Sequence, residues 1–183
     1  MQRFDAGSAE CLVFTYKEGL LSVVAHDLKI RATRFRIEVD EVTRSVDARF
    51  DAGSLRVVCA MSDETEAPGA LSAANKREIE ANIIRDVLEV RAYPDIQFVS
   101  TKVARRANGY RMTGTLTLHG MARAVSIPVE ERQTAYVATA RIHQPDFGIR
   151  PYTALLGALK VKPDVTVRVT LPRAADDSRR ASG

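Results

Sequence analysis

Alternation of apolar and polar residues with a period of two limits the possible fold of this chain more than any other feature. It is clearest over residues 110–118, where polar residues separate the members of an apolar face. That face consists of Tyr110, Met112, Gly114, Leu116 and Leu118. Because successive side chains of a β-strand point to opposite faces, the pattern predicts a strand with one buried face.

The same alternation recurs along the chain and predicts about eight strands. The further apolar faces are Leu12, Phe14 and Tyr16; Phe35, Ile37 and Val39; Val46, Ala48 and Phe50; Val125, Ile127 and Val129; and Val165, Val167, Val169 and Leu171. Two weaker runs, 95–104 and 134–143, complete the set.

Two glycine-containing dipeptides predict tight turns between neighbouring strands. Asn108-Gly109 precedes Tyr110 and favours a type I′ turn, because both central residues of that turn need a positive φ. His119-Gly120 closes the next strand in the same way. We therefore expect residues 95–130 to form a three-stranded antiparallel meander.

One segment, residues 75–90, has the period of a helix instead. Ile79, Ile83 and Val87 recur at intervals of four residues and predict an apolar helical face. Asn75 with Glu78 three residues later resembles a capping box at the start. Pro94 disfavours helical geometry in the residue before it and so marks the end.

The chain length of 183 residues fits a single domain, and 45% hydrophobic with 27% charged residues is typical of a globular protein. We place this domain at residues 1–172. The tail, 173–183, has no apolar residue beyond alanine and is expected to be disordered. An antiparallel all-β domain of about eight strands with one helix forms either a sandwich or a barrel, and a barrel of that size holds side chains or one small ligand.

Composition and motifs argue against several classes of protein. No apolar stretch approaches the roughly 20 residues of a membrane-spanning helix, so no integral membrane segment is expected. The first residues contain no apolar core of a secretory signal, which predicts a cytoplasmic location. The net charge is +4, but the basic residues are spread along the strands, so we expect no nucleic-acid partner. Cys11 and Cys59 lack metal-binding spacing and are interpreted as buried free thiols.

Several motifs, taken in order, resemble the YceI-like family. They are Tyr93-Pro94-Asp95-Ile96-Gln97-Phe98-Val99-Ser100, the stretch Gly114 to Arg123, Asp146-Phe147-Gly148-Ile149, the closing strand Val165 to Leu171, the strand Val13-Phe14-Thr15-Tyr16 and the segment Ala25-His26-Asp27-Leu28. The resemblance implies an extended, eight-stranded antiparallel lipocalin-like barrel with one flanking α-helix. It also implies that the interior holds a polyisoprenoid or a comparable lipid.

Bulky or adaptable apolar residues are the candidates for contact with such a ligand. They are Phe14, Phe35, Ile37, Phe98, Met112, Leu116, Leu118 and Phe147, and the alternative for each is ordinary core packing. Two apolar loops, 19–25 and 149–159, could form a lid at the mouth, with Tyr152 in the second loop. The alternative for these loops is packing on the end of the barrel or a contact in a homodimer.

The three histidines are the residues best suited to acid–base or metal chemistry. His26, beside Asp27, is a candidate for binding a ligand head group at the mouth. Because no HxH or HExxH spacing is present, we expect no metal site. No catalytic elbow surrounds Cys59 or Ser22, and we expect no cofactor and no catalytic residue.

The function that we predict is non-catalytic: binding or sequestering an amphiphilic isoprenoid or fatty-acyl molecule, in a carrier or stress-related role. One alternative is an enzyme on the same barrel, in which His26, Asp27 and another histidine or a tyrosine converge beside a cavity. The other is a dimeric protein-interaction module with a closed barrel.

Overall fold

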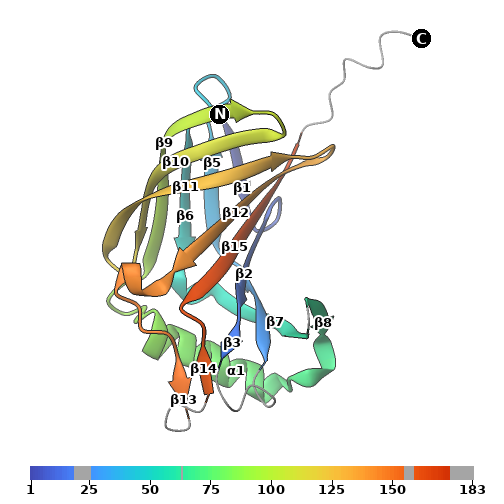
Figure 1. Ribbon diagram of the computed structural model, residues 1–183, viewed down its shortest axis with the longest axis vertical. Helices are drawn as coiled ribbons and strands as arrows, with labels where there is room; N and C mark the ends of the chain where they lie inside the picture. The colour runs from blue at the N-terminus through green and yellow to red at the C-terminus, as the bar shows by residue number, and fades with distance from the viewer. Residues whose placement is uncertain (19–25, 63, 155–158, 174–183) are drawn as a thin grey trace, which may run out of the picture.

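A computed structural model describes residues 1–18, 26–62, 64–154 and 159–173 (Figure 1). Most of these residues form one curled antiparallel sheet, a half-barrel around an interior space. The strands of this sheet are β1 (Gln2–Asp5), β2 (Glu10–Thr15), β4 (Asp27–Ala32), β5 (Phe35–Val39), β6 (Val46–Asp51), β7 (Leu55–Ser62), β8 (Thr65–Ala67), β9 (Asp95–Arg106), β10 (Gly109–Leu118), β11 (Met121–Glu131), β12 (Ala135–His143) and β15 (Asp164–Pro172).

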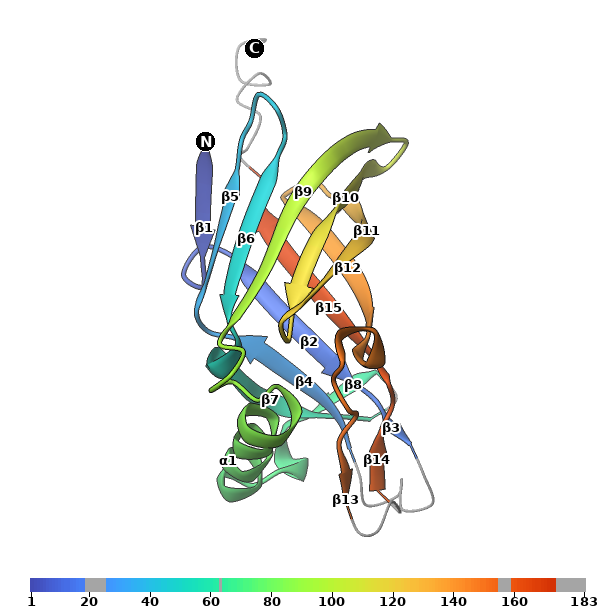
Figure 2. The ribbon, with the colours of Figure 1, turned by 90° about the vertical axis from the view of Figure 1, so that its left-hand side faces the viewer.

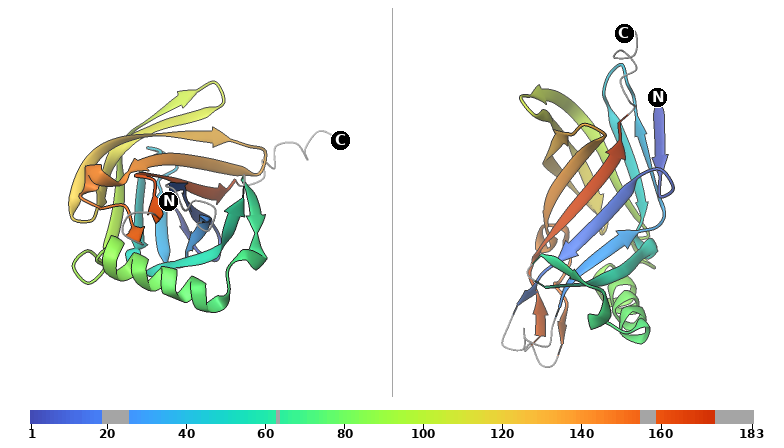
Figure 3. Two further views of the ribbon diagram at one scale, coloured as in Figure 1. Left: turned by 60° about the horizontal axis from the view of Figure 1, so that its bottom comes forward. Right: turned by 90° about the vertical axis from the view of Figure 1, so that its right-hand side faces the viewer.

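The strand order explains how the sheet curls. It runs β1-β5-β6-β9-β10-β11-β12-β15-β2-β4-β7-β8. Only two residues separate β4 from β5, and a single 3₁₀ turn, Ala52–Ser54, separates β6 from β7. Hydrogen bonds span this bend, from Thr33 N to Ser54 O and from Asp51 N to Arg34 O, each 3.1 Å long. Strand β4 thus continues directly into β5, and β6 into β7, although the two members of each pair lie toward opposite ends of the strand order. These connections turn the sheet back on itself (Figure 3).

The predicted number of strands is not confirmed, because the structure divides the described part of the main sheet into twelve. Each of the predicted runs contains a strand. The strands without a prediction are β1, β4, β7 and β8. Strand β7 has a continuous apolar run at its centre, where the successive residues Cys59 and Ala60 are both buried and no alternation results. Strands β1 and β8 lie at the edges of the sheet, and each has few inward-facing residues to form a pattern.

The predicted meander is confirmed, with β9, β10 and β11 paired in antiparallel order. His119 and Gly120 have φ values of 51° and 72°, as a type I′ turn requires. The type I′ turn predicted at Asn108-Gly109 is wrong. The turn residues are Ala107 and Asn108, and only Gly109 has a positive φ. Gly109 already pairs with Glu130, and a Cβ there would lie 2.1 Å from the carbonyl oxygen of Val129. Glycine is needed for this close approach.

The predicted helix is present but shorter and begins earlier. It comprises α1 (Ala73–Asn82), followed by a π-helical turn, Ile83–Val87. The N-cap is Ser72, whose hydroxyl accepts from the amide of Asn75 at 3.1 Å, while the Asn75 side chain accepts from the amide of Ser72. The predicted cap residue therefore lies at the third helical position. Within the described residues, no helix has the length and apolar character that a membrane span requires.

The helix lies across the lower end of the half-barrel, next to a small second sheet (Figure 2). Glu80 of α1 accepts a hydrogen bond from the amide of Val57 at 2.8 Å, and Lys76 donates to the carbonyl of Val58 at 2.7 Å. These bonds fix the helix to β7. The small sheet consists of β13 (Thr153–Ala154), β14 (Leu159–Val161) and β3 (Lys17–Glu18). The predicted lid segment 19–25 and the tail 174–183 lie outside the described residues, as does part of the second loop.

The buried apolar residues form two clusters on the inner side of the sheet. One is centred on Ile37, Ala48 and Phe98, which lie on paired strands. The other, around Leu118 and Phe147, lies at the lower end. Both cysteines are buried and free, as predicted.

Candidate functional site

The interior of the half-barrel is not filled by side chains. It contains a cavity of about 670 Å³ whose walls are mainly aliphatic and aromatic. Strand β15 alone contributes Val165, Val167, Val169 and Leu171, the complete inward face that the alternation predicts. Ile83, Val87 and Leu88 close the end nearest the helix. The predicted apolar stripe of the helix is therefore turned toward the interior.

Five of the predicted ligand-contact residues line this cavity. They are Ile37, Phe98, Met112, Leu116 and Leu118. These side chains come from β5, β9 and β10, and cross-strand pairing places Leu116 directly opposite Phe98. The structure thus brings them to one surface, and their contact with a ligand stays a prediction.

Phe14 is not among the residues that line the cavity. Strand β2 turns Cys11, Val13 and Thr15 inward, so Phe14 lies on the outer face, where the guanidinium of Arg168 stacks 5.0 Å from its ring centre. The prediction that Leu12, Phe14 and Tyr16 form the inward face of this strand is therefore wrong. Cys11 to Phe14 are all apolar, so the alternation there does not tell one face from the other.

Phe35 and Phe147 are buried but line neither of the two cavities. The Phe35 ring packs against Phe50 with a centroid distance of 5.6 Å. Phe147 belongs to the lower apolar cluster, and its carbonyl oxygen lies 3.2 Å from His119 Nδ1. For these two residues the structure favours the alternative of core packing.

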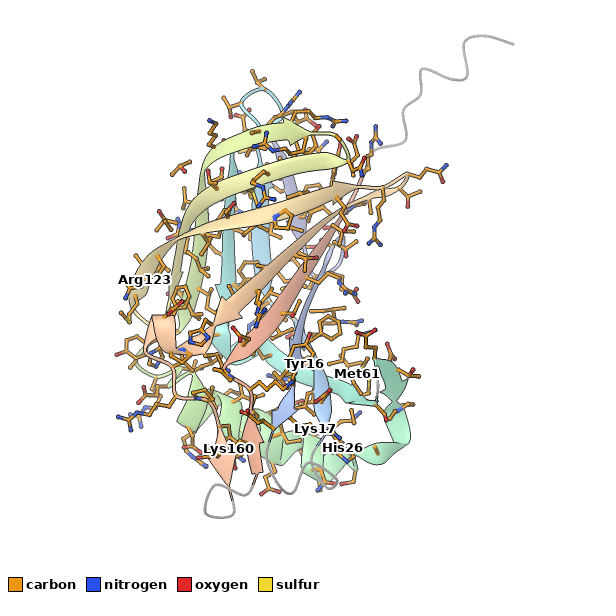
Figure 4. The ribbon with its side chains drawn as sticks, viewed as in Figure 1. Tyr16, Lys17, His26, Met61, Arg123 and Lys160 are labelled. Carbon is orange, nitrogen blue, oxygen red and sulfur yellow. The ribbon has the colours of Figure 1, made fainter. Side chains whose placement is uncertain are left out.

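A second, more polar cavity of about 270 Å³ lies between the helix, the small sheet and β4. Its walls include the predicted residues His26 and Tyr152, together with Lys17, Lys160 and Glu78. Figure 4 shows Lys17, His26 and Lys160 at this lower end of the molecule. Five residues line both cavities, which are therefore neighbours: Thr15, Ile30, Ile83, Val87 and Gln144.

The histidines occupy three separate environments. His26 is half-buried in the second cavity, while the neighbouring Asp27 carboxylate accepts from the amide of Lys17 at 2.7 Å. His119 Nε2 lies 2.9 Å from Glu89 Oε2, and its ring packs 4.2 Å from that of Tyr93.

His143 Nδ1 lies 3.1 Å from Asp164 Oδ1. The hydrogen bond from Arg141, aided by that from His143, lowers the pKa of Asp164. Over the part of the chain that the structure describes, no three His, Cys, Asp or Glu side chains are grouped so that they could hold a metal ion.

Cys11 lines the large cavity, and desolvation raises the pKa of its thiol to about 12. A thiol with so high a pKa is almost entirely protonated near neutral pH. Cys11 is therefore a poor nucleophile and acts as part of the apolar wall.

The upper end of the large cavity, at the β5–β6 hairpin and the end of β15, has a different character. Arg44, Arg173, Tyr110 and Tyr136 all line it. The guanidinium of Arg44 lies 5.5 Å and that of Arg105 4.8 Å from the ring centre of Tyr110. Sequence reasoning missed these arginines. Two signals were available: Tyr110 lies on the predicted inward face of its strand, and Arg105 is paired with it across the predicted hairpin. Arg44 and Arg173 are distant from Tyr110 in sequence and gave none.

Comparisons with known proteins agree with this architecture. The model of the YceI-like domain matches residues 8–172. The crystal structure of Burkholderia cenocepacia BcnA is similar, with a TM-score of 0.64 and 17% sequence identity, over 93% of this chain and 99% of that one. The Campylobacter jejuni YCEI protein has a TM-score of 0.54 and 15% identity, over 80% of this chain and 85% of the other.

No curated protein matches the chain. The two solved structures are similar to this chain in their fold. The match to the domain model spans nearly all of the curled sheet, together with the helix and the small sheet. On this match, the chain belongs to the YceI-like family.

Proposed function

We propose that this protein binds one amphiphilic molecule with an isoprenoid or fatty-acyl chain in the large cavity, and carries or sequesters it without chemical turnover. The observation that carries the proposal is the cavity itself, about 670 Å³ with mainly apolar walls. Ligand sites of small molecules are typically concave, apolar and of this size. Membership of the YceI-like family, whose fold is a lipid-binding barrel, supports the same conclusion.

The energetics favour a long apolar chain as the ligand. Each buried methylene contributes about 0.8 kcal/mol, so about 15 buried carbons contribute roughly 12 kcal/mol before the costs of ordering. Such a chain needs few directed contacts. The adaptable side chain of Met112 and the rings of Phe50 and Phe98 in the wall suit a flexible ligand of this type.

We also propose to regard β4 with β5, and β6 with β7, as two long bent strands. The main sheet, apart from the edge strands β1 and β8, then corresponds to the eight-stranded lipocalin-like barrel of the prediction. On this interpretation the ligand lies within the curled wall of hydrogen-bonded strands.

The hydrogen bonds of the polar side chains fit a binding role better than they fit catalysis. The Asp27 carboxylate accepts from a backbone amide, and no hydrogen bond among the described residues joins it to His26. The Tyr152 hydroxyl accepts from Asn82 at 3.3 Å. The convergence of His26 and Asp27 that catalysis requires is therefore not supported, and His26 is assigned to the wall of the second cavity.

A cavity-filling substitution tests the proposal. Ala138 lines the cavity and is paired with Val129 and Val169, which line it too. A phenyl ring in Ala138→Phe takes the place of roughly three ligand methylenes, which predicts about 50-fold weaker binding. Displacement of the neutral dye Nile red by geranylgeraniol and by oleamide measures the affinity.

Ala124→Phe is the matched control, because Ala124 is exposed on the neighbouring strand β11 and does not line the cavity. This variant is expected to bind like the wild type. Equal affinities of Ala138→Phe and the wild type would refute the site, and failure of the wild type to bind either compound would refute the proposed function.

A further inference from the structure

The upper end of the large cavity carries a group of guanidiniums and aromatic rings that an apolar ligand does not need. We call Arg44, Arg105, Arg173, Tyr110 and Tyr136 the arginine–tyrosine rim. Tyr110 lies beneath two guanidiniums, at 5.5 and 4.8 Å, and Arg173 lies 5.9 Å from the ring centre of Tyr136. The two rings meet edge to face at 6.1 Å. The rim is therefore one connected cluster formed by several strands and one hairpin.

The guanidiniums of the rim are only partly paired with carboxylates. Glu131 pairs with both Arg105 and Arg173, the latter at 3.2 Å. Among the described residues, Arg44 has no carboxylate partner within 4 Å and is held over the Tyr110 ring instead. Within the ion pairs of the rim, one carboxylate thus serves two guanidiniums, and in the described part of the chain the guanidinium of Arg44 has none.

The other carboxylates in the wall of the cavity have donors of their own. Asp40 accepts from the amides of Val42 and Thr43 at 2.8 and 2.9 Å. Glu41 accepts from the side-chain amide of Gln2. Asp51 lies at the opposite end of β6, where it pairs with Arg34 at 2.7 Å. Asp40 and Glu41 lie on the same hairpin as Arg44 and oppose an anion there, but among the described residues neither forms an ion pair with it.

We propose that the arginine–tyrosine rim binds the anionic head group of the amphiphile, with Arg44 as the principal contact, while the chain extends down the cavity. This inference rests on the proposed function and narrows it to amphiphiles that end in a carboxylate or a phosphate. A guanidinium donates two parallel hydrogen bonds to such an anion. The tyrosine rings below hold the guanidiniums at the boundary between water and the apolar wall.

The lower cavity is the rival location for an anion, because Lys17, Lys160 and His26 line it. Glu78 lines the same cavity and opposes an anion there. The rim is favoured because Arg44 and Arg173 belong to the wall of the larger and more apolar cavity, so that one molecule can contact the rim and the apolar wall together.

Pairs of ligands that differ only in their charge test the inference. Oleate is compared with oleyl alcohol, and geranylgeranyl phosphate with geranylgeraniol, each by displacement of Nile red from the full-length protein. The substitution is Arg44→Asn, since Arg44 has a φ of 60° and asparagine tolerates that conformation better than most residues. The control, Arg106→Asn, removes the same charge from an exposed position at the neighbouring hairpin that does not line the cavity.

The wild type is expected to bind the anionic member of at least one pair about tenfold more tightly, which corresponds to about 1.4 kcal/mol. Arg44→Asn removes this preference and leaves the affinity for the alcohols within about twofold, while Arg106→Asn keeps the preference. The pair that shows the preference identifies the head group as a carboxylate or a phosphate.

Equal binding of acid and alcohol by the wild type would overturn the inference and leave the proposed function intact. Loss of oleate affinity in Lys17→Gln but not in Arg44→Asn would also overturn it and would place the anion in the lower cavity. Failure of all four compounds to bind would overturn the inference and the proposed function together.

Discussion

The close packing of β9 against β10 predicts that Gly114→Ala destabilises the protein strongly. A Cβ at Gly114 would lie 2.3 Å from the carbonyl oxygen of Val99 and 2.6 Å from the ring of Phe98. The pairing register of the two strands shifts between Thr113 and Gly114, so the strands are irregular at this point. The Cβ would collide with the backbone of Val99, which cannot rotate away as a side chain can.

The magnitude follows from two opposing effects. Overpacking of this kind costs up to about 3 kcal/mol, and replacement of glycine by alanine returns about 1 kcal/mol through the unfolded chain. The net loss of about 2 kcal/mol lowers the melting temperature of a domain of this size by roughly 4–8 °C. Thermal unfolding followed by circular dichroism measures this difference.

Gly69→Ala is the matched control, because a Cβ there has no neighbour within 4 Å. This control is expected to melt within about 2 °C of the wild type. A Gly114→Ala protein that melts as late as the control would refute the reasoning, since it would mean that the two strands separate without cost.

Three further predictions concern stability and reactivity. Ile30 is 2% exposed and lines both cavities. Ile30→Ala is expected to lower the free energy of unfolding, measured in urea, by about 2–3 kcal/mol. A loss below about 1 kcal/mol would contradict the role of Ile30 in the core. Because the folded pKa of Asp164 is lowered, its ionised form stabilises the fold above the ordinary pKa of 3.8, and this stability is lost as the pH falls through the folded value. Asp164→Asn is thus expected to melt earlier than the wild type at pH 7, by a difference that narrows as the pH falls below 3.8, and a difference that does not change with pH would count against this. Cys11, with a pKa of about 12, is expected to resist a thiol-specific disulfide reagent at pH 8 until urea unfolds the protein, and rapid labelling of native Cys11 would show that the wall is open.

Much of the sheet could be predicted because alternating apolar and polar residues indicate a strand with one buried face. The inward faces of β10 and β15 were predicted residue by residue, since polar residues separate their apolar ones. The same rule failed at β2, where both faces carry apolar residues and Phe14 lies outside. The bends that connect β4 to β5 and β6 to β7 depend on hydrogen bonds between distant segments, which no local pattern records.

The candidate site was predicted in part for the same reason. Apolar lining residues such as Met112 and Leu118 follow from their position on a strand. The arginine–tyrosine rim joins residues more than sixty positions apart, and a surface arginine carries no local sign of what lies beneath it. His26 was recognised from its chemistry, but its place in the second cavity depends on the helix and the small sheet. The extent of the domain, the disordered tail, the homodimer and the cytoplasmic location stay predictions.

Native mass spectrometry shows whether the large cavity holds a ligand, because it counts the molecules bound to each chain. The protein is measured as purified and again after incubation with geranylgeraniol, oleamide and oleate, and bound material is identified after organic extraction. We expect the 20.1 kDa chain with one additional amphiphile in a one-to-one complex, and loss of that complex in Ala138→Phe. A bare chain mass under every one of these conditions would contradict the claim that the cavity is a binding site.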